Sequence, residues 1–164
     1  MRRFGLTEIA DKPSVPEGSG PDELTIRRLS YSDLPAVIAI ERRSFTTPWS
    51  LAMFVLELSK PSGICLAVVD GDERLAAYLV CSRYDELWHL MNIAVDPSRR
   101  RQGIATELIE ELFGRTRGRR VTLEVRVSNL SAIRMYERFG FKSAGVRRRY
   151  YHDNDEDALI MWRQ

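Results

Sequence analysis

The chain has 164 residues, with 25 Lys and Arg against 23 Asp and Glu and a formal net charge of +2. This length suits one domain, which would bury about 70% of the surface that its unfolded chain exposes. The near balance of charge lacks the basic excess of nucleic-acid-binding domains, so direct nucleic-acid binding is not expected and any cationic site must be local. Its apolar runs all fall short of the ~20 residues of a membrane-spanning helix, so we expect no membrane association.

The first 23 residues differ in composition from the rest. Arg2 and Arg3 resemble the pair of a twin-arginine export signal, but no apolar stretch of about 7–15 residues follows them, so a cytoplasmic protein is expected. Pro, Gly, Ser and acidic residues dominate 11–23 and cannot bury enough surface to offset the entropy of ordering. We therefore predict a disordered arm at 1–23 and a single domain at 24–164.

From Leu24 onward, the apolar pattern alternates between helical and extended periodicity. It predicts a strand at 23–29, helices at 32–45 and 51–60, a hairpin at 63–84, a strand at 86–97, a helix at 103–115, a strand at 121–127, a helix at 128–140 and strands at 141–153 and 156–164. This order favours an α/β domain, in which a mixed sheet carries helices on both faces.

Local signals place several boundaries of these elements. Ser32 or Asp33, followed by Pro35, marks the start of the first helix, and Ser50 the start of the second. Gly114 fits the end of the third helix. For three further features the expectations are a tight turn at Asp70-Gly71-Asp72, a buried stripe of Leu51, Phe54, Val55 and Leu58 on the second helix, and two ordinary buried thiols, with no metal site, at Cys65 and Cys81.

A short segment after the strand at 86–97 combines three arginines, Arg99–Arg101, with Gly103 before a helix. A helix N-terminus offers unpaired N–H groups and a partial positive charge, and glycine lets a ligand approach the backbone closely. The arginines would add charge around a pyrophosphate or a 3′-phosphate, although a solvated surface run is the alternative interpretation. Neither GxxxxGK[ST] nor GxGxxG is present, which argues against nucleoside triphosphates and dinucleotides.

Residues 100–105 match the pattern [RQ]xxGx[GA], and in this place after a central strand they resemble the acetyl-CoA motif of the GNAT family of N-acetyltransferases. Further segments resemble the RimI-type protein N-terminal acetyltransferases within that family: PWS at 48–50, NIAVDP at 92–97, LEVRVSNLSAIRMYERFGF at 123–141 and RRRYYHDNDEDALIM at 147–161. The resemblance spans about residues 24–162. It implies the GNAT fold, with a mostly antiparallel sheet and splayed central strands, and acetyl transfer from acetyl-CoA to the N-terminal alanine of a small-subunit ribosomal protein.

The resemblance also implies which residues hold the acetyl donor. The backbone of Ile93, Ala94 and Val95 would pair with the pantetheine arm, although their apolar side chains also suit the core. The other expected contacts of acetyl-CoA are Arg100, Arg101, Gln102, Gly103, Ile104, Ala105, Thr106, Asn129 and Tyr136. Asn129 is also a natural N-cap for the helix that follows it.

Two residues are predicted to carry the catalysis. An α-amine has a pKa near 7.7–8, so a modest carboxylate suffices as base, and the resemblance assigns this role to Glu124. Tyr136 matches the family's proton donor to the departing thiolate, although its helical spacing alone favours core packing. Histidine is the residue type whose ordinary pKa lies nearest neutrality, so His89 is a second candidate for the base, with a buried core residue as the alternative, and His152 suits the surface.

The acceptor side is predicted from the resemblance alone. Phe45 and Trp49, with Tyr150 and Tyr151, match positions that flank a peptide N-terminus, although tyrosines at a sheet edge are also ordinary. Arg147–Arg149 form either a site for an acidic acceptor or ribosomal RNA, or a solvated strand.

Two other functions stay open. The first is a GNAT enzyme that acetylates lysine or a small amine, and the second is a non-catalytic RNA-binding module, whose RNA affinity would depend on salt. The sequence leaves the oligomeric state undetermined between a monomer and a weak dimer.

Overall fold

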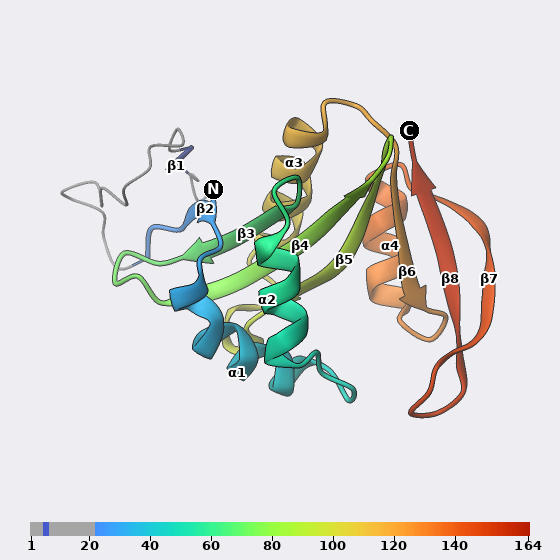
Figure 1. Cartoon of the computed structure of the whole chain (residues 1–164), viewed down its shortest axis with the longest axis horizontal. Helices are drawn as coiled ribbons and strands as arrows, with labels where there is room; N and C mark the ends of the chain where they lie inside the picture. Colours follow the sequence, from blue (N-terminus) through green and yellow to red (C-terminus); the bar gives the residue numbers. More distant parts are fainter. Residues whose placement is uncertain (1–4, 7–21) are drawn as a thin grey trace.

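The computed structural model describes residues 5–6 and 22–164 (Figure 1). Its elements, in chain order, are β1 (Gly5–Leu6), β2 (Thr25–Arg28), η1 (Tyr31–Asp33), α1 (Leu34–Ser44), α2 (Leu51–Ser59), β3 (Ile64–Val69), β4 (Leu75–Tyr84), β5 (Leu87–Val95), η2 (Pro97–Arg99), α3 (Ile104–Thr116), β6 (Val121–Arg126), α4 (Leu130–Arg138), β7 (Lys142–Tyr151) and β8 (Glu156–Arg163). Most of the predicted arm lies outside the described residues. The strand β1 belongs to this arm and pairs in parallel with β2.

One sheet of eight strands runs through the described part of the chain, in the order β1-β2-β3-β4-β5-β6-β8-β7. Neighbouring strands from β2 to β5 are antiparallel, as are β6, β8 and β7, and β5 pairs with β6 in parallel. The mixed, mostly antiparallel sheet with helices on both faces therefore agrees with the fold predicted from the sequence. Helices α1 and α2 cover one face, and α3 and α4 cover the other (Figure 1).

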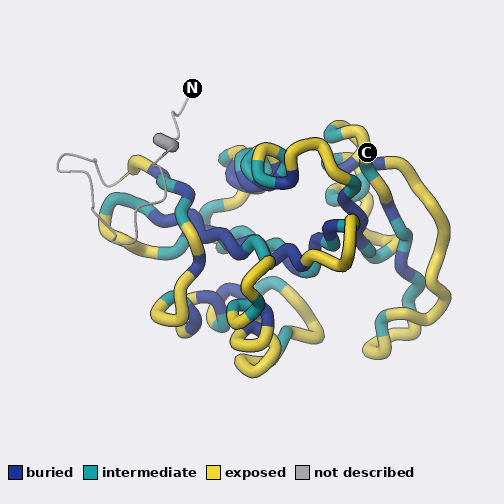
Figure 2. The backbone as a smooth tube through the Cα atoms, turned by 45° about the horizontal axis from the view of Figure 1, so that its top comes forward, coloured by how far each residue is buried: buried dark blue, intermediate teal, exposed yellow. Residues whose placement is uncertain are grey.

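Each face of the sheet carries its own apolar core. Leu66, Leu79 and Leu123 pack with α3, while Tyr78 and Ala67 pack with α1 and with Phe54 of α2. Alternate residues of a strand point to opposite faces, and helices cover both faces of this sheet. Strands β3 and β4 are therefore buried along nearly their whole length. The buried strands form the centre of the molecule, whereas β7 is exposed (Figure 2).

A β-bulge in β5 changes which face its side chains occupy. Val80 pairs with Asn92 and Cys81 with Leu90, so Met91 is the inserted residue. Leu90 belongs to the core under α3, but Ala94, four residues later, belongs to the core under α1. Bulges bend a strand and increase its twist.

The parallel pair of β5 and β6 is short. Only Trp88 with Val121 and His89 with Thr122 are paired within the described residues, and the two strands then diverge. The rest of β6 pairs with β8 on its other side. A gap therefore opens in the middle of the sheet beyond His89, as the predicted splay requires.

Three local expectations need correction. On α2 the buried residues are Phe54 and Glu57, while Leu51 and Val55 are exposed, because only one side of this short helix meets β4. Helix α3 continues past Gly114 to Thr116 and ends at Arg117, which adopts the left-handed conformation.

In the turn between β3 and β4, the positive φ falls on Glu73 and not on Asp70-Gly71-Asp72. The carboxylate of Asp70 closes this turn by accepting from the N–H groups of Asp72 and Arg74. Of the two candidate caps for α1, Asp33 occupies the N-cap position, although its side chain makes no capping hydrogen bond to α1. Its carboxylate instead pairs with Arg27 and accepts from the N–H of Ser30.

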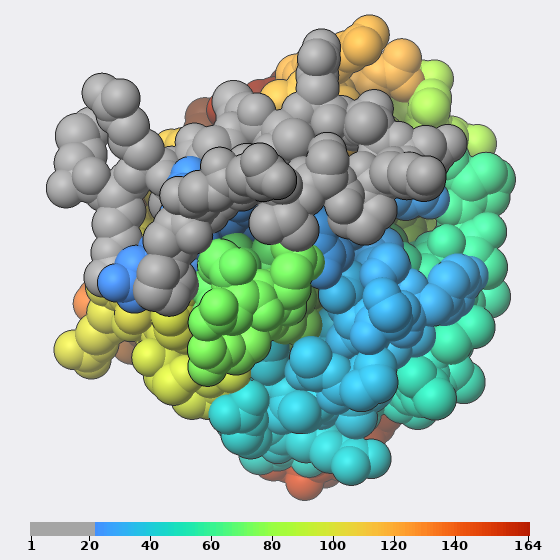
Figure 3. Space-filling view, turned by 90° about the vertical axis from the view of Figure 1, so that its left-hand side faces the viewer, coloured from blue at the N-terminus to red at the C-terminus, as the bar shows by residue number. Residues whose placement is uncertain are grey.

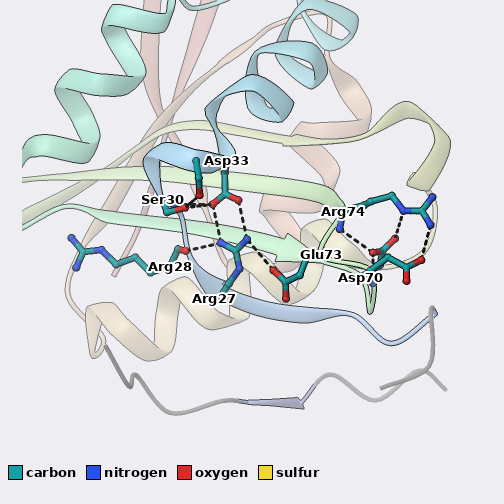
Figure 4. Close-up of polar contacts among 9 residues, drawn as sticks. Arg27, Arg28, Ser30, Asp33, Asp70, Glu73 and Arg74 are labelled. Carbon is teal, nitrogen blue, oxygen red and sulfur yellow. Dashed lines mark hydrogen bonds and ion pairs between the residues drawn. The ribbon is translucent and has the colours of Figure 1, made fainter. Parts of the chain in front are cut away.

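A cluster of ion pairs fastens this turn to the start of the domain (Figure 4). The guanidinium of Arg27 binds Asp33 at 2.8 Å and reaches Glu73 at 3.4 Å. These contacts raise the pKa of Arg27 and, despite partial burial, lower the pKa of Asp33. Figure 3 shows the turn beside β2 and α1 on one face of the molecule.

Cys65 and Cys81 are buried free thiols, as predicted, and burial raises the pKa of both. Within the described ranges, no helix has the length and apolar character needed to cross a membrane.

Candidate active site

The segment from Asp96 to Gly103, here the donor loop, joins β5 to α3. Asp96 begins it by accepting from the N–H of Ser98 at 2.9 Å, and Gly103 ends it as the N-cap of α3. Arg101 and Gly103 have φ values of 60° and 77°. Left-handed residues in such a turn aim successive N–H groups at one point, and the start of a thirteen-residue helix adds its dipole.

Glycine is needed at 103 because of its backbone conformation. A Cβ atom at this position would meet nothing within 4 Å, but a φ of 77° is costly for other residues. The open space above Gly103 is what a phosphate would need to approach the backbone. The residues therefore fit the pyrophosphate of a nucleotide-like cofactor.

The arginines of the donor loop have separate environments. Arg100 donates from Nε to the carbonyl of Val95 and from its Nη2 to the hydroxyl of Ser44, both at 3.3 Å, so it also braces the loop. Arg99 has Nε and Nη2 buried without a hydrogen-bond partner in the described residues. Arg101 is exposed.

Ile93, Ala94 and Val95 lie along the gap beyond the last β5–β6 pair. Their side chains pack into the two cores, as the core interpretation required. Because β6 has diverged at this level, the side of β5 that faces it lacks a paired strand in the described structure. An extended ligand arm can therefore pair with this backbone.

Glu124 lies across the same gap, on β6. Its Oε2 lies 2.5 Å from Nε2 of His89, and its Oε1 lies 3.2 Å from Nε of Arg147 on β7. The side chain is 9% exposed. The hydrogen bond from His89 holds the pKa of Glu124 below its ordinary value, against the effect of burial and with help from the charges of His89 and Arg147.

The two candidate bases of the sequence thus form one contact. Glu124 is ionised at neutral pH, and His89 lies against it in the last paired position of β5. His152, by contrast, is exposed in the β7–β8 turn, as expected.

Tyr136 belongs to α4 on the opposite face. Its ring packs edge-on against Phe141, with centroids 5.5 Å apart, inside the core that also includes Leu123 and Val125. Burial raises the pKa of Tyr136, so the phenol stays protonated at neutral pH and can donate a proton. The core packing and the donor role are therefore compatible.

Leu123 and Val125 point to the face of α4, so Glu124 between them points to the other face. The predicted base therefore lies beside the gap between β5 and β6, and the predicted acid belongs to the core on the opposite face of the sheet. A reacting centre in this gap would be approached by its acceptor from one face and by its donor from the other.

Asn129 has the position predicted for it. Its side chain accepts from the N–H of Ala132 at 3.2 Å and caps α4. The structure thus supports the capping interpretation, and contact with the donor stays a prediction.

The aromatic residues of the acceptor side come from two segments. In residues 45–49, here the acceptor connection between α1 and α2, Phe45 is 40% exposed and Trp49 packs against Phe54 with ring centroids 5.2 Å apart. In β7, Tyr150 is 43% exposed and packs edge-on against Tyr151. Phe45 and Tyr150 have surface to offer a ligand, whereas much of the Trp49 ring is used in the core.

The two segments are linked. Thr46 donates to a carboxylate oxygen of Asp153 at 2.8 Å, and Arg126 holds the same carboxylate at 2.9 Å. Arg126 also lies 3.9 Å from the centroid of the Tyr151 ring. Of the arginines at 147–149, Arg147 pairs with Glu124, so this run is not simply a solvated strand.

Sequence reasoning missed a buried polar cluster beside this site. It consists of Glu41 of α1, Tyr78 of β4 and Asn92 of β5. The one available signal was a glutamate on the apolar side of a helix, and that pattern names no partner.

Comparison with known proteins settles the family. The family model described as "Acetyltransferase (GNAT) family" matches residues 34–141. This chain belongs to the GNAT family. It is an N-acetyltransferase that uses acetyl-CoA, as the sequence predicted.

Its relatives include a putative [ribosomal protein bS18]-alanine N-acetyltransferase of Bacillus subtilis, 38% identical over 140 residues, which are 84% of this chain and 93% of that protein. The crystal structure of the ribosomal-protein-S18-alanine N-acetyltransferase from Escherichia coli is similar with a TM-score of 0.78 and 38% identity, over 85% of this chain and 92% of that one. Arabidopsis thaliana NAA60 in complex with acetyl-CoA has the same fold, with a TM-score of 0.77 and 23% identity over 85% and 98% of the two chains.

Within the described ranges, no group of three His, Cys, Asp or Glu side chains is arranged to hold a metal ion. Acetyl-CoA supplies, as a thioester, the acetyl group that the enzyme transfers to an amine.

Proposed function

We propose that this GNAT enzyme acetylates the α-amine of a protein N-terminus, and that its acceptor is the N-terminal alanine of ribosomal protein bS18. The relatives named for this reaction support the proposal, since they match more than four-fifths of the chain at 38–39% identity. The observation that carries it is the position of Glu124 beside the β5–β6 gap, with Tyr136 in the core on the opposite face of the sheet. This reaction would take place in the cytoplasm, where ribosomal proteins are made.

Glu124 acts as the general base in this proposal. It removes a proton from the attacking amine, directly or through one water molecule. Its low pKa makes it a weak base, but an α-amine with a pKa near 7.7–8 is already partly neutral at pH 7–8 and needs little help. A lysine amine near 10.4 would need a stronger base, so the site suits an N-terminus better.

Tyr136 acts as the general acid. The phenol is held on α4 by its packing against Phe141, and it keeps its proton because burial raises its pKa. It donates that proton to the sulfur as the thiolate leaves.

The donor loop and β5 hold acetyl-CoA. The N–H groups at Arg101–Gly103 and the start of α3 bind the pyrophosphate, with Arg100 beside them, and the backbone of Ile93–Val95 pairs with the pantetheine arm. Gln102, Ile104, Ala105, Thr106 and Asn129 complete the proposed contacts.

Four aromatic residues flank the acceptor in this proposal: Phe45, Trp49, Tyr150 and Tyr151. Phe45 and Tyr150 are the exposed members, so they are the ones proposed to touch the first residues of the peptide.

A thiol-release assay with two peptides tests this function. One peptide carries the N-terminal sequence of bS18 with a free alanine amine, and the other is the same peptide with a blocked N-terminus and an internal lysine. Turnover of the free peptide alone is expected. Turnover of the blocked peptide would instead favour a lysine acetyltransferase, and turnover of neither would move the acceptor to a small amine.

A further inference from the structure

The carboxylate of Glu41 is one of the most deeply buried charged groups in the described structure, with 1% of the residue exposed. No cation lies within ion-pair distance of it in the described ranges. It accepts hydrogen bonds from the hydroxyl of Tyr78 and from Nδ2 of Asn92, the latter at 3.1–3.2 Å to both oxygens. Burying a carboxylate is costly unless donors surround it, and neutral donors do so here.

Glu41 also reaches out of the core to the acceptor connection. Its Oε1 accepts from the backbone N–H of Trp49 at 2.8 Å, just before Ser50 caps α2. The four elements that meet at this carboxylate are α1, β4, β5 and the acceptor connection. It therefore fixes the end of a segment whose other part, at Thr46, is fixed by Asp153.

The β5 bulge aims Asn92 at this carboxylate. Without the bulge at Met91, strict alternation would place Asn92 on the face of Leu90, under α3. With it, Asn92 points toward α1 and binds Glu41, while the next residue, Ile93, begins the stretch proposed to pair with the donor. One carboxylate thus ties the acceptor connection to the strand along the gap.

We propose that Glu41 is a positioning residue for the acceptor: by holding Trp49 and Asn92 together, it sets the distance between the acceptor connection and the reacting gap. This inference rests on the proposed function. Glu41 takes no part in the chemistry, because its oxygens are occupied by Tyr78, Asn92 and Trp49 inside the core.

The test is Glu41→Gln, with Glu57→Gln as its matched control. Glu57 is also buried, binds Ser82 of β4 and Lys60 just after α2, and has no contact with the acceptor connection in the described structure. Gln at 41 cannot accept from all three donors, so one charge-assisted hydrogen bond is lost. We therefore expect the KM for the peptide to rise about tenfold and the KM for acetyl-CoA to stay unchanged. Glu57→Gln should lower thermal stability but leave both KM values unchanged.

Hydrogen exchange gives a readout that does not depend on activity. The Trp49 amide should be protected in the wild-type protein and exchange faster in Glu41→Gln, while amides of α3 stay unchanged. If Glu41→Gln does not fold, protection of Trp49 in the wild-type protein before peptide is added still supports the anchor, and fast exchange there overturns it.

The outcomes separate the two proposals. A wild-type enzyme that acetylates no peptide overturns the proposed function and the acceptor role of Glu41 with it. A wild-type enzyme that acetylates the peptide, together with an unchanged peptide KM in Glu41→Gln, overturns only the positioning role. Equal rises in the two KM values would also overturn it, since they would indicate a general loss of structure.

Discussion

The donor loop keeps its shape through backbone conformation, whereas the acceptor connection keeps its shape through side chains from distant parts of the chain. Arg101 and Gly103 turn the donor loop by their positive φ values, within a few residues of the helix that they open. The acceptor connection depends on Glu41 and Asp153, the second of which lies more than 100 residues away from Thr46.

This difference teaches how each side can vary. A backbone cradle binds the same phosphates whatever side chains surround it, so it suits a donor common to a whole family. A wall held by side chains can shift with single substitutions, so it suits an acceptor that differs between enzymes. Between the two sides, at the gap, lie the groups proposed to do the chemistry.

The largest expected effect is at the gap. Glu124→Gln should reduce kcat/KM for the peptide by about 10²–10⁴-fold, because it removes the proposed base and keeps its shape. Steady-state assays with calorimetric titration of acetyl-CoA would measure it. Unchanged turnover would shift the role of base to another group, with His89 first among them.

A smaller effect is expected on the donor side. Gly103→Val should weaken acetyl-CoA binding about tenfold and cost about 1–3 kcal/mol of stability, because a branched residue resists a φ of 77°. Gly118→Val is the matched control, since Gly118 has a φ of 72° and equally open space at the other end of α3. It should cost the same stability and leave binding intact. Equal binding by both variants would refute the phosphate cradle.

On the acceptor side a modest effect is expected from Thr46→Val. The substitution keeps the side-chain shape but removes the hydroxyl that donates to Asp153. The peptide KM should rise about two- to fivefold, because one exposed hydrogen bond is lost, while the KM for acetyl-CoA stays constant. A change in the acetyl-CoA value alone would contradict the separation of the two sides.

The smallest expected effect is a shift in the pKa of Glu124. His89→Phe keeps a ring on β5 but removes the hydrogen bond that chiefly lowers the pKa of Glu124, so that pKa should rise. Arg147→Ala should raise it less, because its charge contributes least. The Glu124 carboxyl resonance, followed by NMR during an acid titration, measures both shifts. A fall in either variant would show that the assigned causes are wrong.

The lowered pKa of Glu124 also makes the stability of the fold depend on pH. Because the pKa of Glu124 in the folded protein lies below its ordinary value, the ionised group stabilises the fold above about pH 4.5. That contribution is lost as the pH falls through the pKa of the folded state.

Much of the fold could be predicted because its signals are local. Apolar periodicity, Ser50 as a cap and the run before Gly103 indicate elements and their order without knowledge of any partner. The errors came where tertiary packing decides: which side of α2 is buried, and how far α3 continues beyond Gly114.

The site was predicted unevenly for the same reason. The resemblance named Glu124, and the residues alone named His89, but that they touch depends on the register of β5 with β6. Glu41 was missed because its partners Tyr78 and Asn92 meet it only after a bulge has turned the strand. Neither register nor bulge position is encoded in a residue type.

The most direct test of catalysis at the gap uses the double variant Glu124→Gln with Tyr136→Phe. Acetyl-CoA and the free bS18 peptide are titrated into it separately by calorimetry, and its acetyl transfer is then compared with that of the wild-type enzyme. We predict wild-type affinity for both ligands with transfer reduced by at least about 10²-fold, since each substitution removes a proton-transfer group while Gln and Phe keep the shapes of the side chains that they replace. Transfer at the wild-type rate, or loss of either affinity, would contradict the placing of catalysis at the gap.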